Sequence, residues 1–501
     1  MADNSWKSMD DRAFESALSK SVPPQPPSDV ADGVTPWKRA VNQLLAGTAL
    51  TSLTVRNLGL HLILPAVGII LLLLGFRALR RENRWFTACL ALAAACAALR
   101  LPGLILSATL LRPALETPPL SLLLGWGGTA ARLALYFCLW LGLRAVGRKA
   151  GQHPWALPAL ALFGWYVLIT VLAVTAGGQS VLLVIASCIG FVLILYCLYS
   201  LARDLAETGY GIRPAAVRLS DRWLALLLAA AVAAGCVLGG LLGSRYPMAW
   251  APAEGAGPAA AAVRQRLEEL GFPAYVLDDL TDADILACDG ALEAAVTVTA
   301  ARLDGSGRVS GPEALDIQGL RITAVAVRLP GDGLRCRVFR HFLWTADPGF
   351  RGTEAIRLTP PYLDQQRRWD PIAPVSGQVL YDRGGQGYAA PFHLLREDPK
   401  GGDPLRSGIW AAFSVPAGAE RCRGYVSYCM EEIMETGGLA DLLNYYHQKT
   451  LLQYPVRSAL EYAQAAALSP WGDASDGRVF LLFQGKLELY CDEHGITEVL
   501  P

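Results

Sequence analysis

The chain has 501 residues, enough for more than one domain, and its 44 Lys and Arg balance its 44 Asp and Glu. Its mean hydropathy of +0.32 exceeds that of an ordinary soluble protein. Up to residue 243 there are 20 Lys and Arg against 11 Asp and Glu, and beyond it 24 against 33, which gives formal charges of +9 and −9. A basic, apolar half before an acidic half indicates a membrane part followed by a water-soluble part, and the acidic half argues against nucleic acid as a partner.

Residues 1–37 lack the apolar core of a signal peptide and are biased towards Pro, Ser and Asp. This composition predicts a disordered N-terminal tail.

Residues 38–243 are predicted to form a transmembrane helical domain. A helix needs about 20 apolar residues to cross a bilayer. Five segments meet this length, namely 58–76, 121–143, 156–175, 181–201 and 223–243. A sixth, 85–111, is interrupted by Arg100–Gly103, so we expect its crossing to end at Leu99 and the rest to return along the membrane surface. A seventh, 40–55, is uncharged but short. The bundle therefore has six or seven crossings, and we favour seven.

Positive charges are concentrated in alternate loops. Arg77, Arg80, Arg81 and Arg84 lie at helical spacing between two apolar runs, and loops 144–153 and 202–222 are also rich in Arg. Because cytoplasmic loops carry the excess of Lys and Arg, these loops are predicted to be cytoplasmic. The C-terminal half is then extracytoplasmic and, with seven crossings, the N-terminus is cytoplasmic.

The stretch ILPAVGIILLLLGFRALRRENRWF, residues 63–86, resembles a segment of uncharacterised multi-pass membrane proteins of Clostridia-type (Firmicutes) bacteria. The resemblance covers this hairpin only. It implies a Gram-positive plasma membrane, but no activity and no site residue.

Three ionisable residues lie within the apolar segments: His61, Arg100 and Arg132. Such residues are functional candidates, because an unpaired charge in hydrocarbon is unfavourable. Arg132 is central in its segment, unless Gly125–Gly128 delays the start of the helix. Arg100 could instead extend to the outer surface, and His61 lies close to a helix end. The apolar segments contain no acidic residue, which argues against a proton relay or a cation transporter.

The second half is predicted to contain a linker, residues 244–262, and a mainly β, sandwich-like domain with accessory helices, residues 263–501. Tyr246 and Trp250 in the linker suit the lipid headgroup level. The predicted strands are 319–329, 333–345, 353–360, 376–382, 408–415, 422–430 and 478–491, the last folded into a hairpin at Gln484–Gly485. The predicted helices are 261–272, a helix capped by Thr281, 437–455 and 456–468.

No motif for chemistry was found in the outer domain. HExxH, CxxC, GxSxG and Walker patterns are absent from the sequence, and 303–311 fails as a calcium loop at Arg308. His341, His393, His447 and His494 are interpreted as surface or core residues. Cys422 and Cys429 cannot form a disulfide if 422–430 is one strand, because they would lie too far apart. We therefore predict no catalytic residue, no cofactor and no metal.

These features predict a multi-pass plasma-membrane protein whose extracytoplasmic domain binds a protein partner or a cell-envelope ligand. The lipid bilayer is the remaining partner, and an enzymatic role is not favoured. The alternative is a transporter subunit or a membrane-embedded enzyme acting on lipid or cell-envelope precursors, in which Arg132 and Arg100 contact an anionic group.

Overall fold

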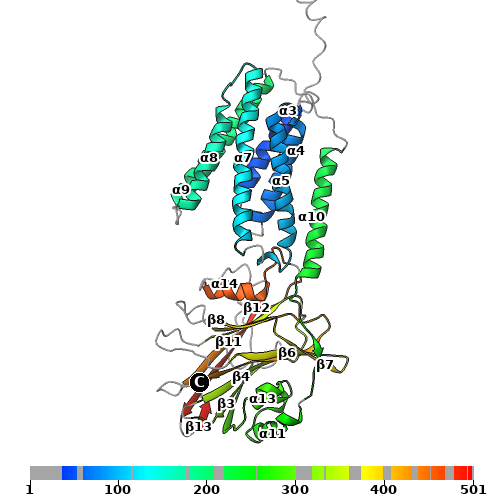
Figure 1. The fold of residues 1–501 in the computed structure, drawn as a ribbon, viewed down its shortest axis with the longest axis vertical. Coiled ribbons are helices and arrows are strands. Elements are labelled where there is room, and N and C mark those ends of the chain that lie inside the picture. The colour runs from blue at the N-terminus through cyan, green and yellow to red at the C-terminus, as the bar shows by residue number, and fades with distance from the viewer. Residues whose placement is uncertain are drawn as a thin grey trace, which may run out of the picture. The chain divides into compact units, whose positions relative to one another are not determined.

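The computed structural model describes residues 36–52, 60–113, 117–175, 181–207, 219–255, 257–300, 319–331, 335–359, 374–398, 408–430, 438–451, 453–468, 479–492 and 495–498. The chain folds as two compact units. The first, here called the helical unit, comprises residues 1–104 and 116–232. The second, the sheet unit, comprises 105–115 and 233–501 (Figure 1). Sequence predictions for 1–35, 303–311, 362–371 and His494 lie outside the described residues.

Long apolar helices dominate the first half of the chain (Figure 1). They are α3 (Pro36–Ser52), α4 (Leu60–Leu79), α5 (Arg84–Leu106), α7 (Leu120–Lys149), α8 (Leu157–Thr175), α9 (Val181–Glu207) and α10 (Asp221–Gly243). Six of these, all except the 17-residue α3, are long and apolar enough to cross a membrane. The six longer helices agree with the predicted segments.

The arginines of residues 77–84 do not share one helix. Helix α4 ends at Leu79, and α5 begins at Arg84 after a short turn. Asn83 caps the new helix, since its Oδ1 accepts the backbone N–H groups of Trp85 and Phe86, both at 3.0 Å. The helical spacing of the arginines is therefore coincidental, and the segment is a tight turn between two antiparallel helices.

Helix α5 continues further than expected. The prediction that it ends at Leu99 is wrong, because the helix runs through Pro102 to Leu106. A proline inside a helix removes one backbone hydrogen bond, and apolar helices tolerate this when neighbouring groups compensate.

Helix α3 packs closely against α4 through glycine. A Cβ atom added to Gly47 would lie 2.7 Å from the carbonyl oxygen of Gly68, so only glycine permits this approach. The Trp37 indole N–H donates to the carbonyl of Ala202 in α9, at 2.9 Å. The short segment predicted as a seventh crossing is thus an integral helix of this unit.

The Arg-rich loops lie at one end of the helical unit. Arg77 and Arg39 lie 3.4 and 4.0 Å from the carboxylate of Asp221. Lys149 and Glu82 form a further ion pair at 3.0 Å. Arg39, in the first turn of α3, therefore belongs to the same end as the basic residues in the last turns of α4 and α7.

The sheet unit contains two antiparallel sheets. Their strands are β1 (Ala251–Pro252), β2 (Glu293–Ala300), β3 (Leu320–Leu329), β4 (Arg335–Trp344), β5 (Glu354–Thr359), β6 (Ser376–Arg383), β7 (Gln386–Pro391), β8 (Leu394–Asp398), β9 (Gly408–Phe413), β10 (Glu420–Met430), β11 (Gly438–Gln448), β12 (Phe480–Asp492) and β13 (Gly495–Glu498). The first sheet has the order β1-β7-β6-β10-β4-β3-β2, and the second β13-β12-β11-β5-β9-β8.

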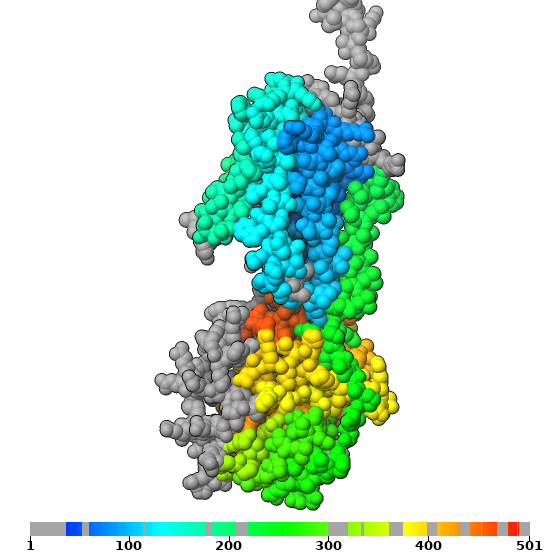
Figure 2. Space-filling view, in the orientation of Figure 1, coloured from blue at the N-terminus to red at the C-terminus, as the bar shows by residue number. Residues whose placement is uncertain are grey.

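The two sheets pack face to face over one apolar core, as the predicted sandwich requires. The ring of Phe342 in the first sheet lies 5.6 Å from Phe413 and 5.2 Å from Tyr445 in the second. Helices η3 (Pro258–Ala260), α11 (Ala261–Glu269), α12 (Ala274–Leu277) and α13 (Asp282–Leu286), here called the helical cap, cover the outer face of the first sheet. Figure 2 shows the cap as a continuous green surface. Helix α14 (Ala459–Leu468) covers the second sheet.

Two predictions within the second sheet are wrong. Residues 437–455, predicted as a helix, contain strand β11, and the predicted hairpin at Gln484–Gly485 is part of the continuous strand β12. Both faces of β11 are covered, so its sequence does not alternate between polar and apolar residues. Gly485 is a packing position, since a Cβ atom there would lie 2.9 Å from Ile322.

Tyr246 and Trp250, predicted to suit the headgroup level, both pack on aromatic rings of the sheet unit. Trp250 makes an edge contact with Tyr381, and Tyr246 stacks on His393 at 4.4 Å. Both aromatic rings therefore belong to the sheet unit.

Predictions made from local sequence patterns in the sheet unit are confirmed. Thr281 caps α13 through the N–H of Asp284, and Gly271 ends α11 with a φ of +88°. Cys422 and Cys429 lie in the single strand β10 and are free thiols.

An ion pair lies between the two sheets. Arg340 of β4 and Asp441 of β11 are fully buried, with Nε and Oδ1 3.2 Å apart. The Tyr428 hydroxyl donates to the same carboxylate, and Arg340 Nη2 donates to the carbonyl of Gly485 at 2.6 Å. Burial raises the pKa of the Asp441 carboxyl, and Arg340 and Tyr428 oppose that change. The net effect is a raised pKa, with Arg340 and Tyr428 limiting the rise.

Replacing Asp441 by Asn leaves Arg340 buried without a counter-charge. We expect the free energy of unfolding of the sheet unit to fall by about 3–5 kcal/mol. The double variant Arg340→Met, Asp441→Leu removes both charges and should recover most of that loss. Pulse proteolysis of the full-length protein in urea measures both, and a double variant no more stable than the single one would contradict this account.

Candidate functional site

Two arginines of different helices line one cavity of the helical unit. Arg100 lies in the last two turns of α5 and Arg132 in the middle of α7. Both line a cavity of about 340 Å³. Its other lining residues come from α3, α4, α5 and α7: Thr51, Pro65, Ile69, Leu72, Cys96, Leu99, Leu124, Gly125, Gly128, Thr129, Leu135 and Tyr136. The structure therefore brings together two of the three predicted polar residues.

The two arginines lie at the same depth. Arg100 is sixteen residues from Arg84, the first residue of α5, and Arg132 is sixteen residues from Arg148 near the end of α7. At 1.5 Å per residue, each lies about 24 Å from the Arg-rich end. The hydrocarbon core of a bilayer is about 30 Å thick, so this distance exceeds half of that thickness.

Neither guanidinium group is neutralised within the described part of the chain. Arg100 and Arg132 have no ion pair or hydrogen bond to a described residue, and the residues lining the cavity include no carboxylate. Two like charges therefore face one cavity. In a low-dielectric environment this arrangement is unfavourable unless an anion joins them.

A second cavity, of about 430 Å³, adjoins the first along α7. It shares Thr51, Gly125, Thr129 and Arg132 with the first cavity. The remaining lining is mainly apolar and aromatic, and includes Leu122, Trp126, Leu133, Trp165, Tyr166, Ile169 and Val174. Arg132 thus lines both cavities, and each cavity combines apolar side chains with hydroxyl groups.

Hydroxyl groups connect the helices around the cavities. The Tyr166 hydroxyl of α8 donates to the Tyr136 hydroxyl of α7 at 3.1 Å, and the two rings stack at 4.2 Å. Ser52 of α3 also hydrogen-bonds to Tyr166. Sequence reasoning missed these residues. The sequence indicates part of this arrangement, because the helical spacing of positions 129, 132 and 136 puts them on one face of α7.

Glycines keep the first cavity open. A Cβ atom added at Gly125 or Gly128 would contact nothing within 4 Å, and both residues line the cavity. Gly127 is equally unobstructed but lines neither cavity. Larger side chains at Gly128 would therefore fill the cavity without displacing the protein around it.

His61 lies apart from this site. It occupies the first turn of α4 and lines neither cavity. Its Nδ1 is buried without a hydrogen-bond partner in the described ranges. The third predicted polar residue is therefore not brought to the arginine pair.

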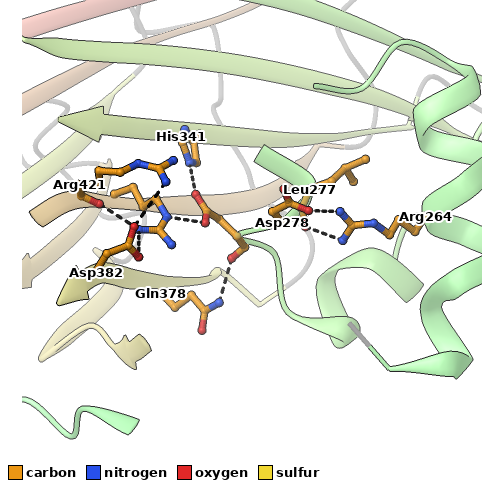
Figure 3. Close-up of polar contacts among 9 residues, drawn as sticks. Arg264, Leu277, Asp278, His341, Gln378, Asp382 and Arg421 are labelled. Carbon is orange, nitrogen blue, oxygen red and sulfur yellow. Dashed lines mark hydrogen bonds and ion pairs between the residues drawn. The ribbon is translucent and has the colours of Figure 1, made fainter. Parts of the chain in front are cut away.

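The sheet unit contains a second polar cluster, which includes His341, Gln378 and Asp382 (Figure 3). Asp279 lies at its centre by its hydrogen bonds. His341 Nε2 donates to its Oδ2 at 2.8 Å, and Arg423 Nε donates to its Oδ1 at 2.7 Å. The Gln378 side chain donates to the Asp279 carbonyl at 2.9 Å. Arg423 also donates to Asp382 at 2.8 Å.

This cluster fastens the cap to the first sheet. Burial lowers the pKa of the Arg423 guanidinium, but Asp279 and Asp382 outweigh that effect and raise it overall. Charges of both signs are therefore matched, and we interpret the cluster as structural. His341 and His447 accordingly lie in the core, as the sequence suggested.

No group of three or more His, Cys, Asp and Glu residues that could hold a metal ion occurs in the part of the chain that the structure describes. No protein-family model and no curated protein matches this chain. The geometry of the cavities is therefore the basis for assigning a function.

Adjacent aspartates offer a matched test of the Asp279 cluster. Asp279 is buried, whereas the Asp278 side chain is 67% exposed and pairs with Arg264 (Figure 3). Asp279→Asn should lower the free energy of unfolding of the sheet unit by about 2–3 kcal/mol, because it removes the carboxylate that His341 and Arg423 share. Asp278→Asn should change it by less than about 1 kcal/mol. Urea midpoints from pulse proteolysis compare the two, and equal effects would contradict the structural role.

Proposed function

We propose that the helical unit binds the anionic headgroup of an amphiphile within the membrane. The observation that carries this proposal is the pair Arg100 and Arg132, which line one cavity without a counter-charge among the described residues. An anion between two guanidinium groups gains charge-assisted hydrogen bonds and relieves their repulsion.

The surroundings favour an amphiphile over a free anion. The anion site lies about 24 Å along the helices from the Arg-rich end. Its neighbouring cavity is lined mainly by apolar and aromatic side chains, Trp126 and Trp165 among them. Tryptophan suits the boundary between headgroups and acyl chains. A molecule with a charged end and an apolar chain matches both cavities.

The lining favours binding or movement of this molecule over chemistry. Arginine, threonine, serine, cysteine, tyrosine and tryptophan supply the polar atoms of the two cavities, and no His, Asp or Glu is among their lining residues. This proposal develops the transporter alternative that the sequence suggested. The other reading, in which the sheet unit binds a protein or envelope ligand, remains open, although the cluster beneath its cap is internally matched.

We further propose a plasma-membrane orientation with the Arg-rich end in the cytoplasm and the sheet unit outside. The meeting of Arg39, Arg77 and Lys149 at one end of the helical unit supports it, because cytoplasmic ends collect positive charge. With α3 as a seventh crossing, the N-terminus is cytoplasmic.

The arginine pair can be tested by binding. We expect Arg100→Gln and Arg132→Gln each to weaken binding of dioleoyl phosphatidic acid by at least about tenfold, since a hydrogen bond to a charged group contributes about 1.5–3 kcal/mol. Arg84→Gln and Arg148→Gln change the same helices at the Arg-rich end and should leave binding within about twofold. Native mass spectrometry of the purified full-length protein measures lipid occupancy. Equal losses in all four variants would refute the site.

The orientation can be tested with two exposed glutamines. Gln152 lies in the loop after α7, and Gln386 lies at the start of β7 in the sheet unit. In intact cells, a membrane-impermeant maleimide should label Gln386→Cys and should label Gln152→Cys only after permeabilisation. A version lacking the native exposed cysteines provides the background. The reverse labelling pattern would invert the proposed topology.

A further inference from the structure

We infer that the bound amphiphile carries a dianionic headgroup, either a phosphate monoester or a diphosphate esterified at both ends, with its chain in the second cavity between α7 and α8. This inference rests on the proposed function and adds the substrate class. It depends on the charge of the site, the volume of the first cavity and the lining of the second.

The charge of the site selects the charge of the ligand. Arg100 and Arg132 supply two positive charges, and the described lining residues offer no carboxylate. A phosphodiester headgroup carries one negative charge and would leave one guanidinium uncompensated. A phosphate monoester carries about 1.5–2 negative charges at neutral pH and balances the pair. Within a low-dielectric layer, the neutral combination is strongly favoured.

The size of the first cavity selects a compact headgroup. Its volume of about 340 Å³ is at the lower end of the range for small-molecule sites, about 300–1,000 Å³. Hydroxyls of Thr51, Thr129 and Tyr136 line it together with the arginines. A phosphate or diphosphate uses such donors fully, because it offers several acceptor oxygens.

The second cavity accounts for the chain. Arg132 lines it together with the aromatic residues Trp126, Trp165 and Tyr166 and the aliphatic residues Ile169 and Val174. A phosphate at Arg132 would therefore place the first carbons of its chain against apolar side chains.

The test compares two lipids with the same chains and different headgroup charges. Full-length protein in phosphatidylcholine nanodiscs is titrated with dioleoyl phosphatidic acid, a monoester, and dioleoyl phosphatidylglycerol, a diester. At pH 8 we expect at least about a tenfold preference for phosphatidic acid. At pH 5 the preference should shrink towards unity, because the monoester dianion takes up a proton with a pKa of about 6 and becomes a monoanion. Inorganic phosphate and pyrophosphate are added as competitors and should displace phosphatidic acid at least about tenfold less effectively than a second lipid monoester.

Single-arginine variants separate charge matching from general affinity. Arg100→Gln and Arg132→Gln leave one positive charge each, so the preference for phosphatidic acid over phosphatidylglycerol should fall to within about twofold. Gly128→Leu should reduce binding of both lipids by filling the first cavity, whereas the matched variant Gly127→Leu should bind as the unmodified protein does.

The outcomes distinguish the inference from the proposed function. Equal binding of the two lipids, weakened equally by the arginine variants, would overturn the dianion and leave the proposed function intact. Pyrophosphate that competes as well as the lipid monoester would overturn the placement of the chain. Lipid binding that no arginine or Gly128 variant alters would overturn both.

Discussion

The structure depends on one constraint, which is that a charge removed from water needs a counter-charge. The sheet unit satisfies it internally. Arg340 meets Asp441 between the sheets, and Asp279 holds His341 and Arg423 beneath the helical cap. Each ion pair joins elements that are far apart in the sequence. Removing one partner leaves the other charge buried without a counter-charge, which is more unfavourable than the loss of one hydrogen bond. The polar residues inside this half therefore specify which surfaces pack together.

The helical unit satisfies the same constraint only in part. At the Arg-rich end, Asp221 and Glu82 compensate neighbouring basic groups. About 24 Å away along the helices, Arg100 and Arg132 line a cavity with no described counter-charge. The Arg-rich end and the cavity both contain arginines, so they differ in whether the chain supplies a carboxylate and not in the type of basic side chain. Where the chain supplies its own anion, the arginines are structural, and where it does not, we propose that an anion from outside completes the site.

How far the sequence predicts this architecture depends on which signal each segment carries. Length and hydropathy identify the six long helices, since a lipid-facing helix must be apolar along its whole length. Pro102 was misinterpreted as a helix end because compensation by neighbouring groups is not visible in sequence. Strand β11 was misinterpreted as a helix because both of its faces are covered, which removes the alternation that identifies a strand. Gly485 was misinterpreted as a turn because a close approach of two sheets requires the same residue.

The arginine site also combines a property that the sequence predicts, the common depth of the two arginines, with one that only the packing of helices determines, their pairing. Arg100 and Arg132 each lie sixteen residues from a basic helix end, so helix geometry alone fixes their common depth in two antiparallel helices. Common depth does not make two residues neighbours, since six helices offer many pairings. The pairing follows from contacts such as Asn83 Nδ2 with the carbonyl of Gly142, at 3.2 Å, which hold α5 beside α7. A residue that caps a helix at one end of the bundle thus helps to place two charges together near the other.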